Sequence, residues 1–170
     1  MSVSTRLHFK IMSFVHETLY GLFRDPYDAL DAAGLKEGQR VLEVGCGPGF
    51  FTVPAAKVVG ERGSVCALDV SPEAIARVQQ KIEKAGVTNV ETILADAAHT
   101  GLPDASFDLI FVFGFVHNTR QMGSILPELH RLLKPAGTLA TEGRLWRSSD
   151  LFHPAEPKAR VLEFRRARIV

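Results

Sequence analysis

The sequence predicts a doubly wound α/β domain, in which a mainly parallel sheet carries helices on both faces. Five strand-like segments alternate with helix-like segments along most of the chain. Three glycines at a spacing of two connect the first of these strands to a helix. The fourth strand, Phe107 to Phe113, is almost continuously apolar, as expected for a central strand covered on both faces. Right-handed crossovers in such a sheet bring the carboxyl ends of the strands, and therefore the ligand crevice, to one edge.

The N-terminal residues 1–38 are predicted to form a helical cap on the core. Apolar residues from His8 to Phe23 recur mostly at three- and four-residue spacing, which is typical of an amphipathic helix. Asp25 and Pro26 begin a second, short helix, which Gly34 ends. No strand–helix unit precedes residue 39.

Residues 39–142 are predicted to form a core that binds a cofactor, within a single domain. Strands are expected at residues 40–44, 64–68, 89–94, 107–113 and 138–141. Helices are expected between them at residues 50–59, 73–85 and 125–133. Ser71 supplies an N-cap for the second of these helices, and Gly86 closes it.

Composition is that of an ordinary globular protein, with 46% hydrophobic and 23% charged residues. The formal net charge of +1 gives no general attraction to nucleic acid, which we do not expect as a partner. No apolar run approaches the roughly 20 residues that span a bilayer, so we expect a cytoplasmic protein. Cys46 and Cys66 lack zinc-type spacing and are expected to be reduced thiols, and no metal site is expected.

The glycine turn and the acid before it predict a ligand site. Gly45, Gly47 and Gly49 let backbone amides approach a carboxylate or phosphate, and the helix dipole favours negative charge there. Glu43, two residues before the first glycine, can accept a hydrogen bond from a ligand ammonium, a group that a dinucleotide lacks. The alternative is a tight turn that binds nothing.

Asp69 and Asp96 follow the second and third strands. A carboxylate at the end of the second strand matches the two hydroxyls of a ribose, and Asp96 would reach an exocyclic adenine amine. The alternative for Asp69 is a cap on the turn into the next helix, which is compatible with binding ribose. The alternative for Asp96 is a solvated loop aspartate.

Five motifs in order resemble those of the class I S-adenosylmethionine-dependent methyltransferases. They span about residues 35–142 and are Glu43-Val44-Gly45-Cys46-Gly47-Pro48-Gly49, Ala67-Leu68-Asp69-Val70-Ser71, Ala95-Asp96-Ala97, Leu102-Pro103-Asp104-Ala105-Ser106-Phe107-Asp108 and Leu132-Leu133-Lys134-Pro135-Ala136-Gly137-Thr138-Leu139. Within the family, the chain is most similar to the small-molecule branch that includes the quinone-methylating enzymes. The resemblance implies a Rossmann-like fold and S-adenosyl-L-methionine as cofactor.

The resemblance also implies a set of cofactor-binding residues. Phe113 and Gly114, after the fourth strand, would line the methionine end, and Tyr20 of the cap would close over it. The alternative for Tyr20 is packing of the cap onto the core. The implied set is Glu43, Gly45, Cys46, Gly47, Gly49, Asp69, Val70, Asp96, Ala97, Phe113, Gly114 and Tyr20.

The expected activity is methyl transfer to a small organic acceptor by in-line displacement. The protein's main task in this reaction is to hold nucleophile and methyl group close and collinear. Where the acceptor must lose a proton, His117 is the candidate general base, with a solvated loop histidine as the alternative. An NAD-dependent oxidoreductase is a further alternative.

The chain departs from the family pattern at two places. Ala136 stands where a second glycine is usual, and residues 143–170 are short for the antiparallel hairpin that normally ends the sheet. Residues 158–170 can supply one edge strand or dock on another chain, and five of them are basic. An unpaired sheet edge would favour a cofactor-binding subunit that is active only with a partner or as a homodimer.

Overall fold

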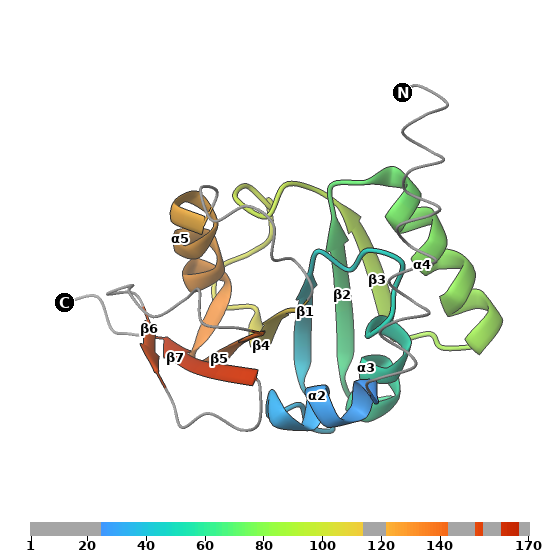
Figure 1. The fold of residues 1–170 in the computed structure, drawn as a ribbon, viewed down its shortest axis with the longest axis horizontal. Helices are drawn as coiled ribbons and strands as arrows, with labels where there is room; N and C mark the ends of the chain where they lie inside the picture. The colour runs from blue at the N-terminus through green and yellow to red at the C-terminus, as the bar shows by residue number, and fades with distance from the viewer. Residues whose placement is uncertain (1–24, 114–121, 143–151, 155–160, 167–170) are drawn as a thin grey trace.

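A seven-stranded sheet forms the centre of the computed structural model, which describes residues 25–113, 122–142, 152–154 and 161–166 (Figure 1). The strand order is β3-β2-β1-β4-β5-β7-β6. The strands are β1 (Arg40–Val44), β2 (Ser64–Asp69), β3 (Val90–Leu94), β4 (Phe107–Val112), β5 (Leu133–Glu142), β6 (Phe152–Pro154) and β7 (Val161–Arg166). Strands β1 to β5 pair in parallel, and β7 pairs antiparallel with both β5 and β6. The predicted fold class and the order of the five parallel strands are confirmed.

The helices in this part of the chain are α2 (Pro26–Ala32), α3 (Thr52–Val59), α4 (Pro72–Ala85) and α5 (Met122–Leu132). Local signals explain where they begin and end. The Asp25 carboxylate accepts a hydrogen bond from the Tyr27 amide at 2.9 Å, which caps α2. The Ser71 hydroxyl accepts one from the Ala74 amide at 3.2 Å, and Gly86 ends α4 in a left-handed conformation with φ of 65°.

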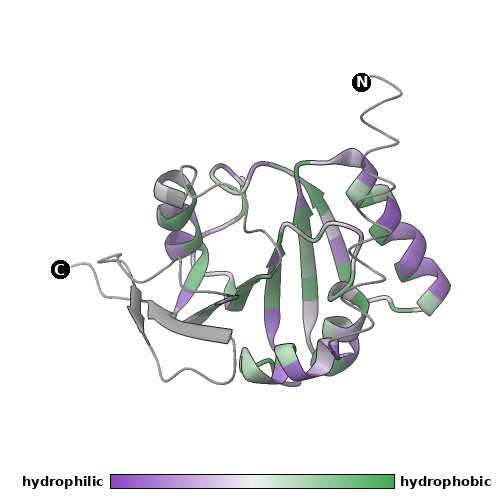
Figure 2. Ribbon diagram, viewed as in Figure 1, coloured by the Kyte–Doolittle hydropathy of each residue, from purple (hydrophilic) through white to green (hydrophobic). Residues whose placement is uncertain are grey.

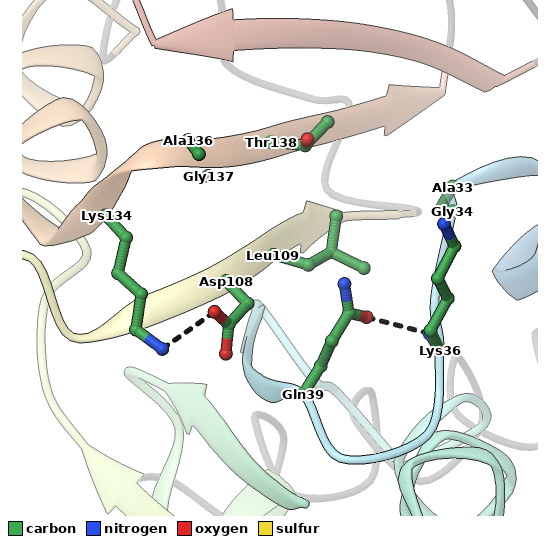
Figure 3. Close-up of a pocket in the computed structure, with 10 residues that line it drawn as sticks. All are labelled: Ala33, Gly34, Lys36, Gln39, Asp108, Leu109, Lys134, Ala136, Gly137 and Thr138. Atoms are coloured by element: carbon green, nitrogen blue, oxygen red, sulfur yellow. Dashed lines mark hydrogen bonds and ion pairs between the residues drawn. The ribbon is translucent and has the colours of Figure 1, made fainter.

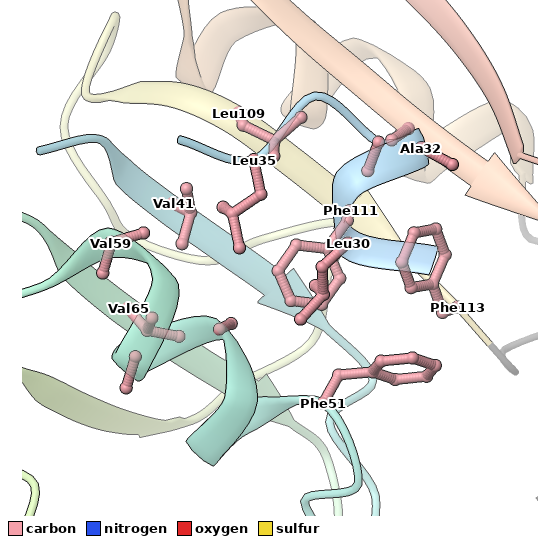
Figure 4. Packing of buried hydrophobic residues seen from close by; sticks show 14 residues of the cluster. Leu30, Ala32, Leu35, Val41, Phe51, Val59, Val65, Leu109, Phe111 and Phe113 are labelled. Carbon is pink, nitrogen blue, oxygen red and sulfur yellow. The ribbon is translucent and has the colours of Figure 1, made fainter. Parts of the chain in front are cut away.

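Helices cover both faces of the sheet, so the domain is doubly wound. Alternate strand residues such as Val41, Val65 and Leu109 pack with α2 and α3, as Figure 4 shows. The intervening residues, including Leu42 and Ile110, pack with α5 on the opposite face. Apolar residues are concentrated on the central strands, whereas α4 presents many hydrophilic residues (Figure 2). Within the described ranges, no helix is both long and apolar enough to cross a membrane.

The C-terminal half of the sheet differs from the sequence prediction. Strand β5 begins at Leu133, which pairs with Phe107, whereas local signals predict a break at residues 135–137 and a strand only from 138. The tail contributes two strands where one was expected, because β6 pairs with β7. Since β7 pairs with residues 138–142 of β5, the expectation that this edge could be left unpaired is wrong.

Ala136 is tolerated in place of the usual glycine because it is exposed and does not need a positive φ. At position 137, in contrast, glycine is required because there is no room for a Cβ atom. A Cβ added there would lie 2.8 Å from Leu133 Cδ2 and 3.0 Å from the carbonyl oxygen of Phe107. The close approach of β5 to β4 therefore depends on the second position of the Ala136–Gly137 pair.

Candidate functional site

The glycine turn connects β1 to α3 and is tied to the end of β2. The amides of Gly45 and Cys46 both donate to the carbonyl oxygen of Leu68, at 2.8 and 3.0 Å. Gly45, Gly47 and Gly49 all have positive φ, at 70°, 51° and 77°, a region that residues with a Cβ rarely adopt. The predicted tight turn is therefore present at the carboxyl ends of two neighbouring parallel strands.

Gly47 and Gly49 have different surroundings. A Cβ on Gly47 would meet no heavy atom closer than 4.0 Å, so this side of the turn is open. A Cβ on Gly49 would lie 2.9 Å from Val78 Cγ2 of α4. Gly49 therefore permits α4 to pack against the turn, whereas the open side of Gly47 leaves room for a ligand.

Asp69 at the end of β2 holds the glycine turn and the start of α4 together. Its Oδ2 accepts a hydrogen bond from the Gly47 amide and its Oδ1 accepts one from the Ser71 amide, both at 2.9 Å. The predicted cap on the turn into α4 is therefore present. An ionised carboxylate has about four acceptor positions, so both oxygens keep capacity for ligand hydroxyls. Ribose binding by Asp69 remains a prediction.

Glu43 is a buried acid beneath the turn, with 3% of its surface exposed. It pairs in register with Ala67 of β2 and Phe111 of β4, and its Oε2 accepts a hydrogen bond from the Thr52 hydroxyl at 2.6 Å. Burial raises the pKa of Glu43 to about 8; the Thr52 hydrogen bond opposes this shift, and the negative charge of Asp69 adds to it. Glu43 is thus a carboxyl whose ionised form would gain from a nearby cation.

Thr52 is a functional candidate that the sequence analysis did not identify. It is the first residue of α3, is fully buried, and orients the carboxyl of Glu43. The only available signal is a hydroxyl residue nine positions after the acid, across the glycine turn. Such a spacing is not informative until the turn geometry is known.

The residues that follow Asp69 and β3 lie at the same sheet edge. Val70, directly after Asp69, is 64% exposed. The Ala95 amide donates to the carbonyl oxygen of Asp69 at 3.1 Å and so attaches the segment after β3 to the end of β2. Asp96 is exposed, and its Oδ1 accepts a hydrogen bond from the Ala98 amide at 2.8 Å, whereas Ala97 is buried.

Two further predicted site residues, Phe113 and Cys46, are buried by packing. The ring of Phe113 has its centroid 5.1 Å from that of Phe51 and 5.2 Å from that of Phe111, within the cluster of Figure 4. Cys46 is buried, and burial raises the pKa of its thiol far above the usual range, so the thiol is neutral. Tyr20, Gly114 and His117, like the helix predicted from His8 to Phe23, lie outside the described residues.

A cavity of about 380 Å³ lies at the opposite edge of the sheet (Figure 3). It is lined by Gln39, just before β1, and by residues near the amino ends of β4 and β5, including Asp108 and Lys134. Lys134 Nζ already pairs with Asp108 Oδ1 at 2.7 Å, and Gln39 Oε1 accepts a hydrogen bond from the Lys36 amide at 2.7 Å. This cavity is separate from the glycine turn. No group of His, Cys, Asp or Glu in the described ranges is arranged to hold a metal ion.

The sequence comparisons with known proteins find similarity to methyltransferases. Residues 41–137 match a family model described as a methyltransferase domain. The chain is 32% identical over 110 residues to the demethylmenaquinone methyltransferase of Geobacillus stearothermophilus, covering 65% of this chain and 47% of the relative. It is also 32% identical over 130 residues to the ubiquinone/menaquinone biosynthesis C-methyltransferase of Escherichia fergusonii, covering 76% of this chain and 50% of the relative.

For one solved structure, the match covers a larger share of the other protein than it does for these two relatives. The crystal structure of a SAM-dependent methyltransferase from Aquifex aeolicus is 35% identical, with a TM-score of 0.69, and the match covers 79% of this chain and 70% of that one. The chain spans about half the length of the curated relatives that it matches.

Proposed function

Because the chain belongs to the S-adenosylmethionine-dependent methyltransferase family, we propose that it transfers a methyl group from S-adenosyl-L-methionine to a small organic acceptor. One observation carries the proposal. Asp69 binds the amide of Gly47, whose other side is open, and the buried acid Glu43 on the neighbouring strand is near enough to Asp69 for their charges to interact. A ligand that carries hydroxyls and an ammonium group matches this arrangement.

The donor and acceptor groups of the site fit the parts of this cofactor one by one. Asp69 has free acceptor capacity for the two ribose hydroxyls. The exposed side chain of Val70 offers an apolar surface to the flat adenine ring, and Asp96 offers an acceptor to its exocyclic amine. Glu43 supplies the negative charge that the methionine ammonium requires.

The cofactor, when bound, supplies a methyl group activated by a positively charged sulfur with a neutral thioether as leaving group. The chain's own contribution is placement. Glu43, fixed by Thr52, anchors the amino acid end at β1, and Asp69 anchors the ribose at β2. Two anchors on adjacent rigid strands hold the reactive part of the ligand in one orientation, and such positioning lowers the barrier to in-line displacement by several kcal/mol.

The acceptor class is inferred from the relatives. The two curated relatives are named a demethylmenaquinone methyltransferase and a ubiquinone/menaquinone biosynthesis C-methyltransferase, so both names refer to quinone compounds. We place the acceptor of this chain in the same class, with a reduced quinone ring as the first candidate. We propose His117 as the general base for an acceptor that must lose a proton. We also propose that the reaction takes place in the cytoplasm.

A methyl-transfer screen tests this proposal. Purified protein is incubated with S-adenosylmethionine and, separately, with phenols, quinols, amines, thiols and arsenite, and release of S-adenosylhomocysteine is measured. Turnover with at least one small acceptor is expected, with His117→Ala slowing it only for acceptors that must lose a proton. Transfer to RNA or protein with none to any small acceptor would contradict the proposal.

The alternative of a partner-dependent subunit is less favoured, because β7 covers the edge of β5 within the same chain. At this end of the sheet the outermost strand is β6, which has three residues, and short edge strands pair poorly with a second chain. A homodimer stays a prediction that light scattering tests, and a monomer that turns over an acceptor would exclude the requirement for a partner. The oxidoreductase alternative lacks a role for the buried acid Glu43.

A further inference from the structure

The segment after β3 is anchored at both of its ends. We call residues 95–102 the Asp96 loop. At its start, the Ala95 amide donates to the carbonyl oxygen of Asp69 at 3.1 Å. Near its end, the amide and the hydroxyl of Thr100 both donate to Glu128 Oε1 of α5, at 3.0 and 2.6 Å. Asp96 lies between these two anchors.

Glu128 is itself held in place by hydrogen bonds from Arg131. Arg131 Nε donates to Glu128 Oε2 at 2.8 Å and Arg131 Nη2 donates to Oε1 at 2.7 Å, and the same guanidinium pairs with Asp104. Arg131 and Thr100 lower the pKa of Glu128 to about 2, so the acceptor is ionised at all physiological pH values. The side chain of Glu128 is 12% exposed.

The loop is also held by packing, because Ala95, Ala97, Ala98 and Leu102 all lie in or against the hydrophobic cluster that α5 shares with the sheet. Ala97 packs with Ile125 and Leu129 of α5, and a tight turn joins Asp96 to Ala98 and His99 through hydrogen bonds of 2.8 and 2.9 Å. The Asp96 carboxylate itself is exposed. Its position is therefore set by the backbone of the loop, which the Ala95 amide ties to β2 and Thr100 ties to α5.

We infer that Glu128 is a positioning residue for recognition of the adenine base, acting through Thr100 on the Asp96 loop. The inference rests on the proposed function, because it assumes that Asp96 accepts a hydrogen bond from the exocyclic amine. Glu128 does not touch the ligand. Its effect is to hold the acceptor in place before binding, so that ordering the loop costs no additional entropy on association.

The test compares two ligands that differ only at the exocyclic position of the base. S-adenosylhomocysteine carries an amine there, and its 6-deamino analogue, with purine in place of adenine, carries only hydrogen, which cannot donate a hydrogen bond to Asp96. Calorimetry on the full chain should give a preference of about tenfold or more for the adenosyl ligand in the wild type. Glu128→Gln and Thr100→Val should reduce this ratio to within about threefold, with Thr100→Ser restoring it.

Asp25→Ala is the matched control, because it removes the cap of α2 and lowers stability at a distance from the loop. It should lower the melting temperature and leave the ratio unchanged. A lower melting temperature with an unchanged ratio in Glu128→Gln and Thr100→Val would overturn the inference alone, and Thr100→Val decides if Glu128→Gln does not fold. A wild type that does not bind S-adenosylhomocysteine would overturn the proposed function together with the inference.

Discussion

Glu43 and Thr52 form the part of the site in which local chemistry is most constrained. A carboxyl withdrawn from water favours its neutral form unless a cation or several donors surround it. Here burial raises the pKa of Glu43, and the negative charge of Asp69 adds to this shift, which outweighs the opposing hydrogen bond from Thr52 and the positive charge of Lys81. Near neutral pH, the free protein therefore keeps most of Glu43 protonated, and a bound ammonium would draw it into the ionised form.

Replacing Glu43 by Gln should separate stability from binding. The pKa of Glu43 is raised from 4.5 to about 8, so its contribution to stability is full below about pH 4.5 and is lost as the pH rises through about 8. Glu43→Gln, which cannot ionise, should lose less stability than the wild type between about pH 5.5 and about pH 8.5 in urea unfolding. At the higher pH it should also bind S-adenosylhomocysteine more weakly than the wild type does, because it cannot supply a negative charge.

The wild type should show a pH dependence of binding that Glu43→Gln lacks. Its affinity for S-adenosylhomocysteine should rise between the same two pH values, with release of a proton that calorimetry in buffers of different ionisation enthalpy detects. Equal pH dependence of binding in the wild type and in Glu43→Gln would show that Glu43 does not face the ligand.

Gly47 and Gly49 allow a second comparison between neighbouring residues. Both have positive φ, so alanine at either position costs about 1–2 kcal/mol of backbone strain. Gly49→Ala should cost about 1–3 kcal/mol more, because its Cβ would press on Val78. Gly47→Ala has no such neighbour and should instead weaken binding of S-adenosylhomocysteine by more than its stability loss explains. Urea unfolding and calorimetry on both variants check this; equal loss of affinity in the two would contradict it.

At the level of elements, the prediction from sequence was most successful where local signals and tertiary pairing agree. Strand β1 and the capped helix α4 lie within one residue of their predicted ends because their limits are set by their own residues. Strand β5 was predicted to begin five residues too late, since Pro135 and Gly137 favour a turn locally whereas pairing of Leu133 with Phe107 extends the strand. The three-residue β6 has no signal of its own and forms only because β7 lies beside it.

The different roles of Ala136 and Gly137 can be tested by exchange. Gly137→Ala should destabilise the fold by about 1–3 kcal/mol, because its Cβ would meet Leu133 and the backbone of Phe107 at or below 3.0 Å. Ala136→Gly, which restores the usual family residue at an exposed position, should change the free energy of unfolding by less than about 1 kcal/mol. Thermal or urea unfolding distinguishes the two, and equal effects would show that β5 does not approach β4 as described.

Deleting residues 158–170 removes β7 and exposes the edge of β5. The truncated chain should unfold at a lower temperature and self-associate in light scattering, because an open edge strand pairs with other chains. A truncated monomer with the melting temperature of the full chain would mean that the tail does not complete the sheet.

For the whole molecule, the positions of the candidate site residues in the fold were predictable as far as residue type and strand position determine them. The glycines, Glu43 and Asp69 lie at the ends of neighbouring parallel strands, as their places in the sequence indicated, and family membership is confirmed by the comparisons. Thr52 and Glu128 were not identified, because their partners are nine and 28 residues away and are selected by helix packing. The roles of Tyr20, Gly114 and His117 stay predictions.

The most direct test of the proposed function is calorimetric titration of the full chain with S-adenosylhomocysteine, using wild type, Asp69→Ala and Ser71→Ala. The control Ser71→Ala removes the cap of α4 but leaves the Asp69 carboxylate in place. We predict that the wild type binds, that Asp69→Ala binds at least about tenfold more weakly, about 1.4 kcal/mol, and that Ser71→Ala stays close to wild type. Binding of NADH in place of S-adenosylhomocysteine, or equal affinity in the wild type and Asp69→Ala, would contradict the assignment.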